Sequence, residues 1–354
     1  MRAAARTSRE MMLPDPFQGH GPPFPPLRTP AIRPVDADAF ERTLADVVRT
    51  APGRATPGPG GGDPGLFGPG SAFWAVNRES AVFLGAGRAM LLQLAHPWVA
   101  AAIAQHSDTL GNPVGRFHRT FGTVYALVFG STAEAVDAAR RLHRRHAAVV
   151  GTLPERAGGH AAGAPYMANE AGALLWVHMT LVDTAAMVHE RVFGPLPAAA
   201  RARYYADSRR CAGLFGIPDD LLPPDWSSFA TAMAATLNGP LLSVTPWARD
   251  AAGTLLGARV AGIRIPRWYR DVTASLLPPH LASAFGLDRD AAVLRRADRG
   301  LDLAARLLPR LPRRLRHVPP YFEALERIAG RPGPSLPTRA LNRLWIGRAR
   351  LGGR

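Results

Sequence analysis

The stretch Gly111–Gly151, GNPVGRFHRTFGTVYALVFGSTAEAVDAARRLHRRHAAVVG, decides the fold. Asn112 is a suitable N-cap, and Pro113 suits the first helical position, where a missing N–H costs nothing. Ser131 and Glu134 form a capping box at the start of a second helical pattern. A glycine follows each pattern and ends it. The stretch therefore predicts two consecutive helices joined by a tight turn, the first ending at Gly130 and the second at the last residue quoted.

Polar residues on these two helices predict a site. On the second helix the apolar residues follow the 3.6-residue period, and His146 falls inside their stripe, four residues after Leu142. Three polar residues with helical spacing share one face of the first helix: Arg116, Arg119 and Thr120. An imidazole in an apolar face, near two guanidinium groups and a hydroxyl, favours a binding site. The alternative is a core histidine that bonds a backbone carbonyl.

Composition bounds the class of protein. The chain has 354 residues, of which 47% are hydrophobic, enough for one large domain or two small ones. The net charge is +16, and every basic residue is an arginine. An all-arginine set with 35 glycines and 34 prolines is typical of a GC-rich genome, which weakens nucleic-acid binding as its explanation. The single cysteine, Cys211, excludes an internal disulfide and a cysteine-based zinc site, and it fits a reducing, cytoplasmic location.

No segment reads as a membrane span or a secretory signal. The N-terminus has no apolar run before Pro14. The apolar run 81–95 contains Arg88 and is shorter than the ~20 residues that a spanning helix needs. We therefore expect a buried core helix there and no transmembrane segment.

The domain limits follow from composition. Residues 1–70 are rich in Pro and Gly and are predicted to be a disordered arm, within which 36–50 could form one short amphipathic helix. Residues 71–330 are predicted to form a single domain, and 331–354 a loose basic tail. Strand-like alternation is nearly absent, so the fold class is all-α.

Two further helical patterns carry buried polar residues. Asn77 is predicted to cap a long helix that Pro97 breaks after His96, which either bonds a freed carbonyl or faces a pocket. A very apolar helix begins at residue 169 or 170 and contains His178 and Asp183. Each needs a partner, because an unpaired buried polar group costs ~1–3 kcal/mol.

Glycines in the first of these patterns predict a close approach. Gly85 and Gly87 stand inside a helical run, where each costs ~1 kcal/mol against Ala. We expect another helix or a flat ligand to lie against them. No strand precedes them, so they are not a dinucleotide fingerprint, and the P-loop, H-E-x-x-H and G-x-S-x-G motifs are absent from the sequence.

Taken in order, several stretches resemble the latex-clearing protein (rubber oxygenase) and MpaB-like oxygenase family. They are GRAMLLQLAHPWVAAAIAQHS, GRFHRTFGTVYALVFG, HRRHAAVVG, LLWVHMTLVDT and LLPRLPRRLRHVPPYFEAL, and together they cover about residues 74–325. The resemblance implies an all-α fold built around haem b, with His146 as the iron ligand. It also implies that Arg116, Arg119 and Thr120 lie over the other face of the haem. His178 and His96 stand at family-typical positions, where haem-edge contacts or structural support are expected.

Two positions differ from the rubber-cleaving members. The rubber-cleaving members carry a Lys where this chain has Arg119. A guanidinium is a poor iron ligand because it stays protonated. Those members also use a Glu near the distal pocket, whereas the sequence around Ala100 offers only Ala, Ile and Gln. The sixth iron position is therefore predicted to hold water or to be open.

The sequence thus predicts a haem-dependent oxygenase that activates dioxygen toward an apolar substrate, for which an isoprenoid is one candidate. One alternative is a haem- or lipid-binding helical protein without turnover. Another is a basic protein that binds nucleic acid or an anionic membrane, because residues 295–354 hold 15 Arg against 4 acids. Leu and Pro interrupt these arginines, and we expect no nucleic-acid partner.

Overall fold

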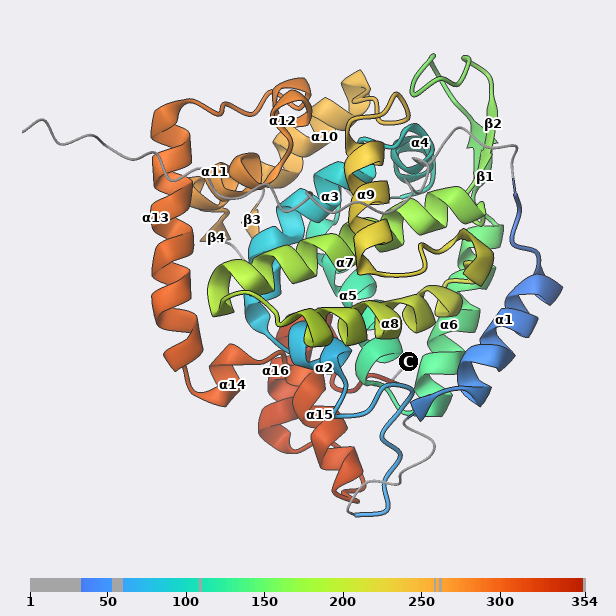
Figure 1. Ribbon diagram of the computed structural model, residues 1–354, viewed down its shortest axis with the longest axis vertical. Coiled ribbons are helices and arrows are strands. Elements are labelled where there is room, and N and C mark those ends of the chain that lie inside the picture. The colour runs from blue at the N-terminus through green and yellow to red at the C-terminus, as the bar shows by residue number, and fades with distance from the viewer. Residues whose placement is uncertain (1–32, 53–59, 108–109, 258, 261–262, 353–354) are drawn as a thin grey trace, which may run out of the picture.

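The computed structural model describes residues 33–52, 60–107, 110–257, 259–260 and 263–352 (Figure 1). The α-helices of these residues are α1 (Ala37–Arg49), α2 (Ala72–Asn77), α3 (Ala86–Leu94), α4 (Pro97–His106), α5 (Pro113–Phe129), α6 (Thr132–Ala147), α7 (Ala171–Phe193), α8 (Ala198–Leu214), α9 (Trp226–Leu237), α10 (Pro246–Gly257), α11 (Arg267–Leu276), α12 (Pro279–Ala284), α13 (Ala291–Leu307), α14 (Arg313–Arg316), α15 (Pro319–Ile328) and α16 (Leu336–Ile346). Short 3₁₀ helices are η2 (Ser80–Gly85), η3 (Asp219–Leu221) and η4 (Leu308–Arg310). Two small antiparallel hairpins pair β1 (Val150–Thr152) with β2 (Pro165–Met167) and β3 (Arg259–Val260) with β4 (Ile263–Arg264). The all-α prediction is confirmed.

The apolar helix α7 runs through the middle of the molecule, with other helices around it (Figure 1). Glu170 caps its first turn, as its carboxylate accepts a hydrogen bond from the backbone N–H of Ala173 at 2.6 Å. Among the described residues it is the one helix long and apolar enough to cross a membrane, but 67% of its most apolar window is buried inside the fold. Its place in the core explains its composition.

The layer of α3, α7 and α11 is packed closely through glycines. A Cβ added to Gly85 would lie 2.4 Å from the Thr184 side chain on α7, and one added to Gly87 would lie 2.3 Å from Thr273 Oγ1 on α11. The expected close approach is therefore made by helices. In the same layer Arg88 is 2% exposed and forms an ion pair with Asp183 at 2.7 Å. This pair gives the half-buried Asp183 carboxylate the partner that it needs.

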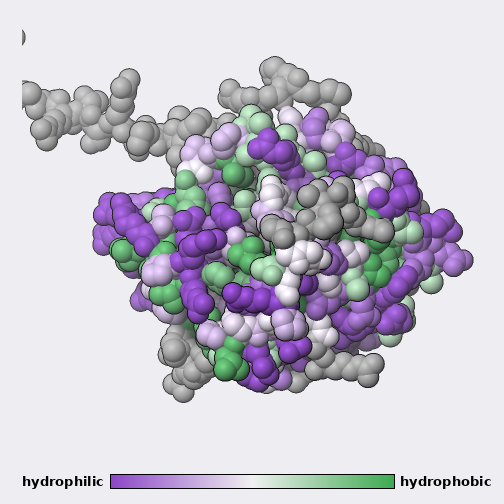
Figure 2. Space-filling model, turned by 90° about the horizontal axis from the view of Figure 1, so that it is seen from below, coloured by the Kyte–Doolittle hydropathy of each residue, from purple (hydrophilic) through white to green (hydrophobic). Residues whose placement is uncertain are grey.

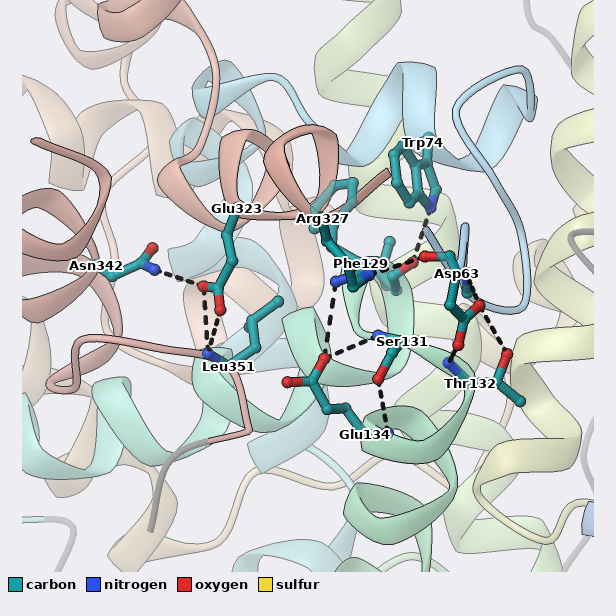
Figure 3. A network of polar contacts seen from close by, with 12 residues as sticks. Asp63, Trp74, Phe129, Ser131, Thr132, Glu134, Glu323, Arg327, Asn342 and Leu351 are labelled. Carbon is teal, nitrogen blue, oxygen red and sulfur yellow. Dashed lines mark hydrogen bonds and ion pairs between the residues drawn. The ribbon is translucent and has the colours of Figure 1, made fainter. Parts of the chain in front are cut away.

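The predicted pair of helices is confirmed at its capped ends. The Asn112 side chain accepts from the N–H of Gly115, and Ser131 and Glu134 form both bonds of the capping box. The second helix ends at Ala147, earlier than predicted, because β1 follows and pairs with β2. The turn that joins the two helices lies in the polar network of Figure 3.

Arg327 on α15 ties that turn to the rest of the molecule (Figure 3). Its Nη2 donates to the carbonyl of Phe129 at 2.7 Å, and its Nε donates to the carbonyl of Asp63 at 2.9 Å. The Asp63 carboxylate in turn accepts from the N–H of Thr132 at 2.7 Å. The start of α6 is thereby fixed by two distant parts of the chain, Asp63 and Arg327.

The N-terminal residues that the structure describes pack into the core, which corrects the predicted arm over 1–70. The predicted amphipathic helix is observed as α1, and Phe40 and Leu44 on it are buried. Leu66 and Phe67 are also buried in the main core. The remainder of the predicted arm, 1–32 and 53–59, lies outside the described residues.

The long helix predicted from Asn77 is divided. Asn77 is the last residue of α2, and the chain continues through η2 into α3 and, after His96, into α4. Pro97 is the first residue of α4, so the predicted break at this proline is confirmed. The structure places the N-cap role at Ser71, whose hydroxyl accepts from the N–H of Trp74.

The C-terminal segment, residues 331–352, is docked on the fold and is not a loose tail. It contains α16, and Leu351 is fully buried. Glu323 on α15 holds it: its carboxylate accepts from Asn342 Nδ2 at 2.6 Å and from the N–H of Leu351 at 3.1 Å (Figure 3). The prediction for 331–354 therefore does not hold where the chain is described.

Several arginines in the C-terminal third are neutralised inside the fold. The ion pairs are Arg296 with Asp271, Arg316 with Glu79, and Arg327 with Glu134. Figure 2 shows the molecule from below, where hydrophilic residues make most of the visible surface and hydrophobic ones form small separate groups. The cationic character of the sequence is thus partly internal.

Candidate functional site

The two predicted helices bring Arg116 and His146 near each other. Arg116 on α5 is half-buried, and its Nη1 donates to Ser107 Oγ at 2.6 Å. Burial and the charge of Arg119 lower its pKa. Its positive charge also helps to lower the pKa of His146, in the last turn of α6. The two helices thus bring a guanidinium and an imidazole within electrostatic range of each other.

His146 is half-buried and neutral at physiological pH. Burial, first, and then the charges of Arg145, His143 and Arg116 lower its pKa to about 4. Within the part of the chain that the structure describes, its ring makes no hydrogen bond. The alternative of a core histidine bonded to a carbonyl therefore finds no partner carbonyl among the described residues. A neutral imidazole without a hydrogen bond is free to use a ring nitrogen as a metal ligand.

Sequence reasoning missed His143, the more buried imidazole of α6. It is 8% exposed and stacks on Phe40 of α1, with ring centroids 4.2 Å apart and an interplanar angle of 10°. Its Nδ1 has no hydrogen-bond partner among the described residues. The signal lay in the pattern itself, because His143 follows Ala139 by four residues on the buried face. The stacking partner comes from a segment that was predicted to be outside the fold.

A pocket of about 270 Å³ opens between α5, α6 and the C-terminal segment. Arg119 and Thr123 line it from α5, and Leu142 and Arg145 line it from α6. Arg119 and Thr120 are both exposed, but Thr120 is not among the lining residues. Of the three residues predicted to share one face of α5, Arg119 lines this pocket, whereas Arg116 and Thr120 do not. The charge of Arg119 nevertheless acts on Arg116.

The pocket wall contributed by the C-terminal segment is fixed to α5. His118 Nε2 lies 3.0 Å from the carbonyl oxygen of Leu344. Gly347, with a φ of 71°, ends α16 in the left-handed region, and a Cβ there would lie 2.7 Å from His118 Nδ1. Glycine is therefore required twice at this turn, for its backbone conformation and for the contact. Arg348 follows it into the pocket wall.

His96 lies in a different setting. It precedes α4, is 4% exposed, and its Nδ1 has no partner among the described residues. Burial and the charge of His160 lower its pKa to about 3. Its ring and that of His160 both lie beside Trp98, at centroid distances of 6.4 and 4.9 Å. Neither its contacts nor its electrostatic partners include the α5–α6 pair.

His178 is buried on α7 against α8. It is 4% exposed, and its ring lies 6.0 Å from that of Phe215. Burial lowers its pKa to about 4, while a backbone hydrogen bond with Ser208 acts in the opposite direction. The ring contacts of His178 and His96 are with aromatic side chains, Phe215 and Trp98.

The residues around His146 fit a metal that brings most of its own ligands. Within the described ranges, no group of three or more His, Cys, Asp or Glu is arranged to hold a metal ion. A single neutral imidazole suffices for the iron of a porphyrin, which supplies four nitrogens itself. The guanidinium group of Arg145, whose charge acts on His146, suits a carboxylate of such a ring, although neither His146 nor Arg116 lines the pocket. The donor set is therefore chemically compatible with haem b.

Fold and site together define an all-α protein with an available imidazole and an arginine-lined pocket between two consecutive helices. The family model described as ER-bound oxygenase mpaB/B'/Rubber oxygenase, catalytic domain, matches residues 74–310. This match covers more than half of the chain, and the chain belongs to that family. It is accordingly an oxidoreductase of the oxygenase class, and the resemblance is confirmed. Comparisons with curated proteins and with solved structures gave no match.

Proposed function

We propose that this oxygenase uses haem b, with His146 as the axial ligand of the iron, and acts on an apolar substrate, for which an isoprenoid is the first candidate. The observation that carries the proposal is the state of His146. Its ring is half-buried, its pKa is lowered to about 4, and it has no hydrogen bond within the described residues. It lies inside the stretch matched by the oxygenase family.

The bound haem would supply the iron that activates dioxygen. Arg116 would then provide a fixed positive charge, because its guanidinium stays protonated and Ser107 holds it in place. A fixed charge at that position stabilises negative charge that develops on oxygen. Arg119 and Thr120, one turn further along α5, would add a second cation and a hydroxyl donor. We propose these three as the residues that act on the oxygen side.

His96 and His178 receive a different role. Both rings are buried, and burial keeps both neutral. We propose that they hold the core around the site and do not ligate the iron. Of the two roles that the family resemblance left open for them, haem-edge contacts and structural support, we propose the second.

The absorption spectrum tests the proposal. The protein reconstituted with haem should show a Soret band that His146→Ala abolishes. The matched control is His280→Ala, because His280 is exposed and contacts the carbonyl of Leu237 at the end of α9. His146→Gly with added imidazole should recover the band, which separates lost ligation from lost folding. A band unchanged in His146→Ala would show that the ligand is wrong.

The pH dependence of haem binding gives a second reading. A histidine must be neutral to ligate iron. Because the pKa of His146 is lowered to about 4, binding should persist as the pH falls to about 5, where an ordinary histidine is mostly charged. Loss of the Soret band with a midpoint near 6.5 would contradict this.

A non-catalytic haem- or lipid-binding protein is the second candidate, and two positions favour it. Arg119 stands where rubber-cleaving members have a Lys, and Ala100, which is buried in α4, stands in the region where they have a Glu. Dioxygen uptake by the reduced, haem-loaded protein with an isoprenoid alkene would establish turnover. Haem binding without uptake would favour the carrier.

A further inference from the structure

All three walls of the pocket between α5, α6 and the C-terminal segment are cationic. Its charged lining residues are all basic: Arg119 from α5, Arg141 and Arg145 from α6, and Arg348 from the C-terminal segment, with His118 beside them. No Asp or Glu lines the pocket among the residues that the structure describes. The charge of the wall is therefore not balanced by the wall itself.

The four arginines differ in their partners. Arg141 forms an ion pair with Asp137, four residues earlier on α6, and Arg348 Nη2 donates to the carbonyl of Gly122 at 2.9 Å. Arg119 and Arg145 form no side-chain hydrogen bond or ion pair within the described ranges. These two guanidinium groups keep their donors available on opposite helices.

The positive groups near the pocket also act on one another electrostatically. Burial lowers the pKa of Arg348, and the nearby charge of Arg141 lowers it further. Arg119 acts in the same way on Arg116, after burial, and Arg145 on His146. The carboxylates of Glu323 and Glu134 act on Arg348 in the opposite direction. A bound anion in the pocket would likewise favour the charged form of Arg348.

The shape of the pocket is fixed, because contacts with the rest of the fold hold its third wall, the C-terminal segment, in place. The contacts of His118 with Leu344 and Gly347 fix the end of α16, and Glu323 holds the chain beyond it at Leu351. This wall begins after the end of the family match at residue 310. The pocket is therefore a feature that the family assignment does not cover.

We propose that this pocket binds an oxyanion group of a ligand, a carboxylate or a phosphate. Arginine presents donors in a planar fork that matches both groups. At about 270 Å³ the pocket is smaller than most ligand pockets, which hold about 300–1,000 Å³, so it suits one charged group and not a whole ligand. The inference does not depend on haem, although a haem carboxylate is one source of such a group.

Titration calorimetry with pyrophosphate at low ionic strength tests the phosphate source. Arg119→Gln and Arg145→Gln should each weaken binding by about tenfold, the loss expected for one charge-assisted hydrogen bond. The matched control is Arg144→Gln, which removes the same charge from the same helix at an exposed position outside the lining. Arg145→Lys should retain part of the affinity because it keeps the charge and loses the fork.

Iron protoporphyrin IX and its dimethyl ester test the carboxylate source, an arm that rests on the proposed function. If the pocket binds a haem carboxylate, the ester should bind the unmodified protein about tenfold more weakly, and Arg119→Gln and Arg145→Gln should remove that difference. His146→Ala should change the spectrum of the iron and leave pyrophosphate binding intact, so failure of the haem proposal remains distinguishable.

The inference is supported if either experiment, with pyrophosphate or with the porphyrins, distinguishes the pocket variants from Arg144→Gln. The experiment that does so also identifies whether the bound group is a phosphate or a carboxylate. The inference is overturned if neither probe binds, or if both bind the two pocket variants as tightly as the control. Circular dichroism of all variants confirms that each is folded.

Discussion

Arg88, in the layer of α3, α7 and α11, and Arg145, at the pocket between α5 and α6, carry the same charge in different surroundings. Arg88 is 2% exposed and has three partners: the Asp183 carboxylate, the Thr184 hydroxyl and the carbonyl of Leu276. Arg145 is exposed and has no partner among the described residues. The polar groups around Arg88 bond to one another, whereas the guanidinium of Arg145 remains available to a ligand.

The difference separates scaffold from site. A buried arginine with a partner for each of its three nitrogens can only be lost at a cost to stability, because its partners are left without compensation. An arginine at a pocket without an acid adds like-charge repulsion and nothing to folding. We therefore expect substitutions in the first region to change stability and substitutions in the second to change binding.

The largest effect is expected for Arg88→Ala. The change leaves the Asp183 carboxylate without its ion-pair partner in the core and should lower the free energy of unfolding by roughly 3–5 kcal/mol. Urea denaturation followed by circular dichroism measures it. Arg88→Met combined with Asp183→Leu should recover most of the loss, since replacing both charges avoids the unpaired one. A double variant as unstable as Arg88→Ala would show that the loss comes from packing.

Gly87→Ala should have the next largest effect on the free energy of unfolding. The new Cβ would lie 2.3 Å from Thr273 Oγ1, so α3 and α11 must move apart, at a cost of roughly 1–3 kcal/mol. Thr273→Ala in the same chain removes the clashing atoms and should restore part of the stability. Gly253→Ala is the matched control, because nothing lies within 4 Å of a Cβ built there. Equal stability of the two glycine variants would contradict the tight packing of this layer.

The scaffold was largely readable from the sequence because its signals are local. Asn112, Pro113 and the Ser131 capping box fix helix starts within four residues, and the structure has them where they were predicted. The prediction of one long helix from Asn77 was wrong because the division of this helix depends on a distant contact. Its apolar run has no local signal for η2, which forms where Tyr269 Oη bonds the carbonyl of Phe83 from far along the chain.

The site was only half readable. Helical spacing predicted that Arg116 and Arg119 share one face of α5; in the structure Arg119 lines the pocket and Arg116 does not. Arg348 was assigned to a loose tail, because the pocket that it lines with Arg145 exists only once the C-terminal segment docks on α5. That docking depends on Glu323 and Leu351, a contact between residues 28 positions apart that no periodicity reveals.

Glu323 makes the stability of the pocket region depend on pH. Burial, with a contribution from the charge of Glu134, raises the pKa of Glu323 from 4.5 to about 7. The native state then binds this proton more tightly than the unfolded chain, so its contribution to stability is complete below about pH 4.5 and is lost as the pH rises through 7.

Urea midpoints at pH 5 and pH 8 test this. The unmodified protein should lose roughly 1–3 kcal/mol more than Glu323→Gln over this range, because the amide carries no proton to lose. Glu155→Gln, in the loop between β1 and β2, is the matched control and should behave like the unmodified protein. A pH dependence that persists unchanged in Glu323→Gln would assign it to another group.

The smallest effect on stability is expected where the effect on binding is largest. Arg145→Gln should change the free energy of unfolding by no more than about 0.5 kcal/mol, since the side chain has no partner to lose among the described residues. A slight gain is expected at low salt, because one charge is removed from a group of like charges, and this gain should fade as salt screens the others. Thermal melts in about 0.01 M and 0.5 M salt, with Arg144→Gln alongside, measure it. A loss comparable to that of Arg88→Ala would place Arg145 in the scaffold and remove the distinction between the two regions.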